Sequence, residues 1–312
     1  MKIFLRSAAM RCFCLAASCM LLAPIPASAR DLFVNNASGD DLHDGAQAAT
    51  TAFGGPLRTL RRALELVLPG DRIVLAKTDE PYRESISLST ASQCGNQLGP
   101  LVIDGQGAVL DGTVPVGERE WESVRGPVFR FRPAKSSYQQ LFLAGKPAVE
   151  RALEPRSHKL PELAPLEWFR RDAEIYFRVE PDKLPGDYPL SYSGLQTGIT
   201  LYHVHDVVIM DLIVQGFRLD GINVNDGVRN CQLIDVTCRG NGRSGVTVAG
   251  SSHARLDGCL LGDNGTAQLR SEGVSATSVA HSELLDNTAP PVVWRGGKLE
   301  IDGQPYVGGS RK

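Results

Sequence analysis

The sequence predicts an all-β protein, a parallel β-helix in which each coil of the chain stacks on the next. Three observations predict this solenoid. Asn241, Asn264 and Asn287 recur at intervals of 23 residues, each after a run of apolar residues at the same offsets. Glycine recurs at the same interval, at positions 227, 250 and 273. The chain holds 32 glycines and only 6% aromatic residues, which favours turns and strands over packed helices.

The first 29 residues resemble a secretory signal peptide. Lys2, Arg6 and Arg11 precede a short apolar stretch, and Ala27-Ser28-Ala29 forms a small-residue cleavage site. Pro24 and Pro26 interrupt the apolar stretch before it reaches the roughly 20 residues of a membrane span. We therefore expect an exported, monomeric protein without a membrane span. Removing three cations changes the formal charge from −2 to −5, and this balance gives no indication of nucleic-acid binding.

Residues 30–112 predict a cap and the first coils. Leu57, Leu60, Leu64 and Val67 follow helical spacing, and Pro69-Gly70 ends the predicted helix. A single amphipathic helix at this place suits a cap over the open end of a solenoid, where apolar surface and strand edges would otherwise be exposed. The strands predicted next are RIVLA, SISLS, LVIDG and AVLDG.

The repeat is absent from residues 113–197, which predict a small β-rich insertion. Its predicted strands are VFRFR, QQLFLAGK and a hairpin in EWFRRDAEIYFRV that turns near Arg171-Asp172. Residues 198–312 predict further coils and a closure. In that closure, Trp294 and the KLEIDG strand are expected to cover the last coil.

The apolar pattern before each Asn also fits leucine-rich repeats, whose period is similar. The segment after each Asn decides between the two. A leucine-rich repeat continues into a helix or a long apolar turn. This chain continues into GRSGVTVAG, in which Val246 and Val248 alternate with smaller or polar residues. Alternation with a period of two and β-branched residues predicts strands.

The repeat also predicts where its polar and sulfur-containing residues lie. Stacked Asn side chains can satisfy the backbone groups that a bend between strands leaves without partners. Cys231, Cys238 and Cys259 fall in different inward columns, so we expect buried free thiols rather than disulfides. No spacing in the chain matches a zinc site or a calcium loop, and the sequence leaves the cofactor open. His205, His253 and His281 are interpreted as surface or packing residues.

The chain also resembles a known group of proteins. Pro69-Gly70-Asp71 before a strand, then Tyr82, Glu84 and Asp111-Gly112, are similar to the opening of secreted β-helix proteins of the pectin-lyase-like superfamily. This resemblance implies a right-handed β-helix. It also implies a polysaccharide as partner, because the superfamily includes polysaccharide lyases, glycoside hydrolases and esterases. The resemblance is specific for fold and weak for activity.

Candidate site residues lie on the strand that comes after the glycine column. Asp226 and Glu272 are two coils apart, or about 9–10 Å at about 4.8 Å per coil, the outer edge of the range for inverting hydrolases. Arg270 is placed beside Glu272 to bind a uronate carboxylate. The predicted catalytic set is therefore Asp226, Glu272 and Arg270. The predicted substrate-binding residues are Tyr202, His203, Asn223, Asn225 and Arg243.

Two functions stay open. One is a polysaccharide lyase or hydrolase, and the other is a non-catalytic carbohydrate-binding or scaffold protein. Acidic residues at turns usually make local hydrogen bonds, so we expect interaction with a polysaccharide and do not assign catalysis. Converging carboxylates, or Lys or Arg beside a carboxylate, in a groove on this strand face would favour the enzyme.

Overall fold

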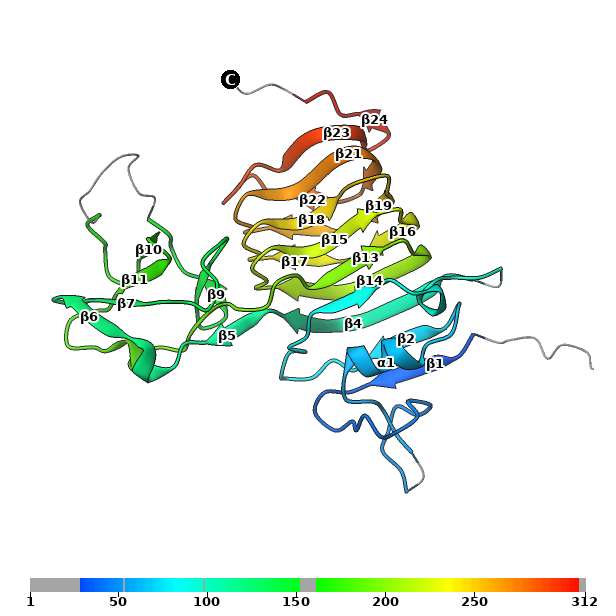
Figure 1. Cartoon of the computed structure of the whole chain (residues 1–312), viewed down its shortest axis with the longest axis horizontal. Helices are drawn as coiled ribbons and strands as arrows, with labels where there is room; N and C mark the ends of the chain where they lie inside the picture. Colours follow the sequence, from blue (N-terminus) through cyan, green and yellow to red (C-terminus); the bar gives the residue numbers. More distant parts are fainter. Residues whose placement is uncertain (1–28, 53, 98, 152–160, 309–312) are drawn as a thin grey trace, which may run out of the picture.

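A computed structural model describes residues 29–52, 54–97, 99–151 and 161–308. The predicted signal peptide lies outside the described residues except for Ala29. The chain forms a stack of coils, and the insertion extends from one side of it as an arm (Figure 1). No helix within the described residues is long and apolar enough to cross a bilayer. The predicted class, an all-β parallel β-helix with a capping helix and a β-rich insertion, is confirmed.

Parallel strands stack in three rows, here called faces 1, 2 and 3. Face 1 contains β1 (Asp31–Val34), β2 (Arg72–Leu75), β4 (Leu101–Asp111), β14 (His205–Gln215), β16 (Arg229–Ile234), β19 (His253–Asp257), β21 (Ala267–Ala280) and β23 (Val292–Ile301). Face 2 contains the second halves of β4 and β14, followed by β17 (Thr237–Arg239), β20 (Leu260–Gly262) and β22 (Glu283–Leu284). Face 3 contains β3 (Ile86–Leu88), β13 (Ile199–Tyr202), β15 (Asp220–Asp226), β18 (Ser244–Val248) and the first halves of β21 and β23.

The hydrophobic core fills the inside of the coils. Cys231 pairs in register with Val207 below it and Ala254 above it, as the predicted inward column requires. Cys231, Cys238 and Cys259 are buried and free, and so is Cys94. Burial raises the pKa of Cys231 to about 12, so this thiol stays protonated at neutral pH. The predicted absence of disulfides among the three repeat cysteines is confirmed.

The Asn stack forms at the bend between faces 2 and 3. Asn241 and Asn264 are fully buried, and the Asn241 side-chain amide donates to Asn264 Oδ1 at 3.0 Å. The next step differs from the prediction. Asn264 donates to Gln268 Oε1 at 2.7 Å, and Gln268 in turn donates to Asn287 Oδ1 at 3.0 Å. Gln268 is therefore interposed, and Asn287 ends the stack as an exposed residue.

The cap uses the residues that carried the family resemblance. Helix α1 (Leu60–Leu66) begins after its N-cap Thr59, three residues later than the apolar spacing predicts. The Glu84 carboxylate accepts hydrogen bonds from the N–H groups of Leu60 and Arg61 at 2.9 and 3.0 Å. The Tyr82 hydroxyl lies within hydrogen-bond distance of carbonyls at the ends of β1 and β2. These motif residues thus join the helix to the first coils.

The insertion consists of two four-stranded antiparallel sheets. One contains β6 (Glu122–Arg125), β7 (Val128–Phe131), β10 (Trp168–Arg171) and β11 (Glu174–Arg178). The other contains β5 (Thr113–Pro115), β8 (Leu141–Leu143), β9 (Lys146–Pro147) and β12 (Leu190–Ser193). The predicted hairpin is present as β10–β11, with positive φ at Asp172 and Ala173. Short 3-10 turns lie at Ala91–Gln93, Glu118–Glu120 and Pro185–Asp187.

The C-terminal strand β23 continues the solenoid. It pairs in parallel with β21 on both face 3 and face 1, and only its end folds back onto β24 (Gln304–Pro305). The KLEIDG segment thus covers the preceding coil, as expected, and does so as part of a further parallel coil. Trp294 does not seal this end, because 43% of the residue remains exposed.

Candidate functional site

The predicted site residues do share one face. Thr200, Asn223, Thr247 and Arg270 pair in register from strand to strand on face 3, as the repeat predicts. Asn223 is half-buried and Asn225 is exposed. The side-chain oxygen of Asn223 is shielded from solvent and has no hydrogen-bond partner within the described residues.

The charged residues of face 3 are occupied by one another. Arg243 donates from Nε to Asp220 Oδ1 at 2.8 Å and makes a second contact with the other carboxylate oxygen. Asp220 is completely buried, so this pair neutralises a charge that has no access to water. Arg270 likewise donates to Glu272 Oε1 at 2.6 Å, and only 14% of its side chain is exposed. These arginines are thus not free to bind a ligand carboxylate.

Asp226 has a local role as well. Its Oδ1 accepts hydrogen bonds from the backbone N–H and the hydroxyl of Ser251, at 2.9 and 3.1 Å. The backbone hydrogen bond from Ser251 is the main cause that lowers the pKa of Asp226. Tyr202 and His203 contact each other edge to face, with ring centroids 4.2 Å apart. The geometry therefore favours a turn-forming role for Asp226. Neither Asp226 nor Glu272 lines the two hollows of about 400 and 1040 Å³ in the surface of the described residues.

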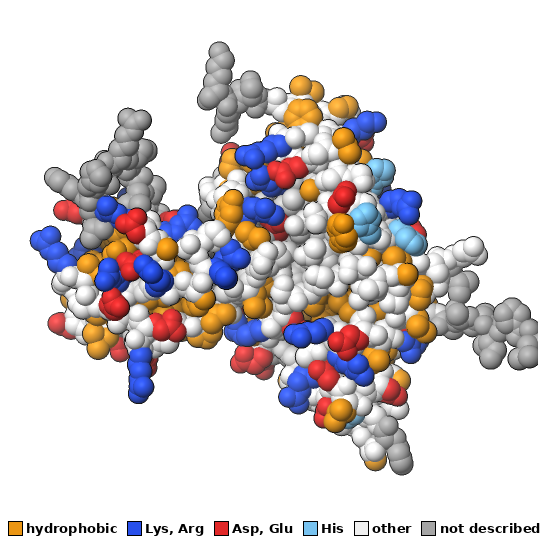
Figure 2. Space-filling model, viewed as in Figure 1, with side chains coloured by type: hydrophobic (Ala, Val, Ile, Leu, Met, Phe, Trp, Pro, Cys, Tyr) orange, Lys and Arg blue, Asp and Glu red, His pale blue; other side chains and the backbone are white. Residues whose placement is uncertain are grey.

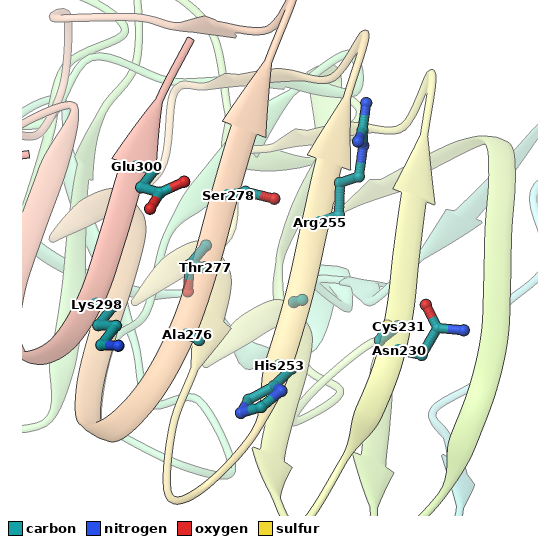
Figure 3. A pocket seen from close by; sticks show the side chains of 10 residues that line it. Asn230, Cys231, His253, Arg255, Ala276, Thr277, Ser278, Lys298 and Glu300 are labelled. Carbon is teal, nitrogen blue, oxygen red and sulfur yellow. The ribbon is translucent and has the colours of Figure 1, made fainter. Parts of the chain in front are cut away.

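A hollow of about 400 Å³, here called the face 1 notch, lies across the outer surface of β19, β21 and β23. The middle strand carries small outward residues, and the strands beside it carry long ones. Ala276 pairs with His253 on one side and Lys298 on the other, and Ser278 pairs with Arg255 and Glu300. Figure 3 shows this arrangement, with the two small residues lying between the two longer rows.

The charges of the face 1 notch differ from those of face 3. His253, Lys298 and Glu300 are exposed, and within the described residues their side chains make no hydrogen bond or ion pair. Arg255 is anchored instead, because it donates to Asp257 Oδ2 at 2.7 Å. Asp257 also bonds the His281 ring at 2.8 Å, and this bond is the main cause that lowers the pKa of Asp257. The notch thus combines an uncommitted ammonium, an uncommitted carboxylate and an unpaired imidazole with one fixed guanidinium.

Sequence reasoning did not assign this site. It interpreted His253 as a surface or packing residue and left Lys298 and Glu300 without a role. The sequence does contain a signal for the notch. The small residues Ala276 and Ser278 are each preceded by a long residue 23 positions earlier and followed by a long residue 22 positions later. Using that signal requires the exact register of β23, which is set by a register shift between Gly273 and Ala276. No group of three potential metal ligands is present in the described part of the chain.

Comparisons with known proteins show a shared fold. No protein-family model matches the chain, and no curated protein matches it. A solved structure described as a glycoside hydrolase is 12% identical with a TM-score of 0.59, over 81% of this chain and 73% of that one. A pectate lyase, Pel9A, is 12% identical with a TM-score of 0.44, over 88% and 62% of the two chains. The complex of XylC with xylose is also 12% identical, with a TM-score of 0.42 over 87% and 69%.

Identity at this level establishes the architecture alone. The stacked parallel strands, the capping helix and the first of these likenesses agree with one another. The chain therefore has a parallel β-helix fold, which it shares with the solved structure described as a glycoside hydrolase.

Proposed function

We propose that this protein is exported and binds an acidic polysaccharide, with one anionic sugar unit held in the face 1 notch. The uncommitted ammonium of Lys298 carries the proposal, together with the unpaired imidazole of His253 across the notch. Lys298 and His253 lie on opposite sides of Ala276, where they can meet a carboxylate from both sides. Glu300 and Ser278 form the neighbouring row, which offers acceptors and a donor to ring hydroxyls.

The dimensions of the notch fit a single sugar unit. The rows on β19 and β23 are two strand spacings apart, or about 10 Å. From the notch, face 1 continues over β16 and β14 toward the N-terminal coils, so neighbouring units of a polymer can lie along it in that direction. A charged uronate could also form an ion pair with Arg255. Asp257 holds this side chain in place but bonds only one of its guanidinium nitrogens.

The test compares polygalacturonate with neutral galactan, two polymers that differ in the carboxylate. We expect polygalacturonate to retard the protein in affinity electrophoresis and galactan to leave its mobility unchanged. Ala276→Tyr should fill the notch and abolish the retardation. Ala280→Tyr, on the same strand but outside the notch, serves as the matched control and should behave as wild type. Equal retardation by both polymers, or by none, would contradict the proposal.

A second candidate function is elimination on the bound uronate. The free imidazole of His253 supports it, because His is the side chain most often used as a base near neutral pH. Arg255 and Lys298 supply the cations that stabilise a carbanion next to a carboxylate. Incubation with polygalacturonate should then produce unsaturated ends, and His253→Gln should stop their formation while binding persists. Binding without new unsaturated or reducing ends would leave a non-catalytic carbohydrate-binding protein.

A further inference from the structure

A larger hollow lies on another side of the molecule, between the insertion and the coils. Its volume is about 1040 Å³, and it shares no lining residue with the face 1 notch. One wall is the β8–β9 hairpin, and the other is formed by the bends after β17 and β20. We call it the module cleft. Figure 2 shows hydrophobic and basic side chains together in the region where the two modules meet.

Glycines at the bends let the insertion dock and so set the width of the module cleft. Gly240 has a φ of +62°, and a Cβ there would lie 3.0 Å from the Phe142 ring. At Gly242 a Cβ would collide with the carbonyl oxygen of Tyr138. The Arg218 side chain adds a hydrogen bond to the Ser137 hydroxyl at 2.5 Å. The contacts at these bends hold the two walls at a set separation.

The two walls differ in chemistry. On the hairpin side, Pro147 and Val149 are exposed, and 64% of Val149 is accessible. The coil side presents a guanidinium, a carboxylate and a hydroxyl from Arg239, Asp263 and Thr288. Arg239 is positioned by Gln215, whose Oε1 accepts from Arg239 Nε at 2.9 Å. An apolar wall opposite a row of polar groups suits a ligand with apolar faces and hydroxylated edges.

The charges of the module cleft balance, in contrast to those of the face 1 notch. Lys146 and Arg239 contribute two cations, and Glu150 and Asp263 contribute two carboxylates. A ligand with a strong net charge therefore gains little electrostatic binding energy from the cleft. Sugar hydroxyls gain more, because each can donate to a carboxylate and accept from a cation.

One residue of the module cleft has a polar atom that lacks a partner. Gln140 lines the cleft, and its side-chain oxygen is shielded from solvent and accepts no hydrogen bond within the described residues. A shielded acceptor without a donor destabilises the folded state. A ligand hydroxyl could donate to this oxygen once the Gln140 side chain turns toward the cleft, and this would favour a donor-rich ligand.

We propose that the module cleft is a second carbohydrate site, which binds a neutral oligosaccharide segment independently of the face 1 notch. The cleft slightly exceeds the upper end of the volume usual for ligand pockets, about 300–1,000 Å³, and therefore accommodates more than one sugar unit. Together the two sites allow the protein to hold an acidic and a neutral glycan at the same time. The proposal shares the carbohydrate class with the proposed function but uses none of its residues.

The test is calorimetric titration of the full mature chain with cellohexaose, xylohexaose and mannohexaose. At least one should bind with a Kd between micromolar and millimolar. Arg239→Met should weaken that binding at least tenfold and leave polygalacturonate retardation unchanged. Lys298→Met should do the reverse, which separates failure of one site from failure of the other. Arg125→Met, an exposed arginine of β6 without a described side-chain partner, is the matched control.

Three results would overturn the proposal. The first is that none of the three hexasaccharides binds. The second is that Arg239→Met binds as wild type while its thermal unfolding is unchanged. The third is that polyglutamate, an acidic peptide probe, competes for the module cleft as well as the hexasaccharide does, because the cleft would then recognise another class of polymer.

Discussion

Faces 1 and 3 both carry charged outward residues but use them differently. On face 3, Arg243 and Arg270 are bound to Asp220 and Glu272, and their side chains are mostly buried. On face 1, Lys298 and Glu300 are exposed and make no described contact with another charge. A repeat therefore predicts where a charge stands, whereas its neighbours on adjacent strands decide whether that charge remains available to a ligand.

The largest expected effect breaks the buried pair of face 3. Arg243→Ala leaves the fully buried Asp220 carboxylate without its cation, and we expect a loss of about 3–5 kcal/mol in unfolding free energy. Lys298→Ala on face 1 should change it by less than about 0.5 kcal/mol. Urea unfolding measures both. A loss near zero for Arg243→Ala would mean that the pair does not stabilise this face.

The next effect concerns ligand binding. Lys298→Met should weaken polygalacturonate binding about tenfold, equivalent to about 1.4 kcal/mol, since it removes the free ammonium of the notch. Arg270→Met should leave binding unchanged, because Glu272 already occupies that guanidinium. Affinity electrophoresis over a range of polymer concentrations gives both constants. The opposite ranking of the two variants would place the site on face 3.

Glu272→Gln should reduce the free energy of unfolding by less than Arg243→Ala does. The Arg270–Glu272 pair is partly exposed, so we expect about 0.5–1 kcal/mol in unfolding free energy. Glu300→Gln on face 1 is the matched change and should have no measurable effect on stability. If both variants lost the same unfolding free energy, the ion pair of Glu272 would contribute no more to stability than the unpaired Glu300.

The smallest effect depends on pH. The hydrogen bond that the His281 ring donates to the Asp257 carboxylate raises the pKa of His281 above its ordinary 6.5. The stabilising contribution of this pair is therefore fully present below pH 6.5 and is lost as the pH rises through the raised pKa. In an NMR titration, Asp257→Asn should move the His281 midpoint back down. An unchanged midpoint would show that Asp257 does not hold this ring.

The sequence predicted the coils well because a solenoid repeats its own contacts. A residue at a fixed offset meets its equivalent, so Cys231, Asn241 and Asn264 were placed correctly from period alone. Gln268 was missed because it enters the Asn stack from outside the repeating column. The insertion interrupts the period, so its docking at Gly240 and Gly242 had no sequence signal.

Predicting the site required more than the column positions. Asp226 and Glu272 were chosen from coil spacing, which says nothing about Ser251 or about the pairing of Glu272 with Arg270. These contacts depend on side-chain conformations and on turn geometry. Free charges and small residues in adjacent rows proved a better guide to the notch than charge alone.

The most direct test of the central claim is an amide chemical-shift map of the protein titrated with trigalacturonate. The account predicts shifts at His253, Ser278 and Lys298 on face 1, and unchanged signals at Asn223, Thr247 and Arg270 on face 3. Shifts confined to the face 3 residues would contradict it.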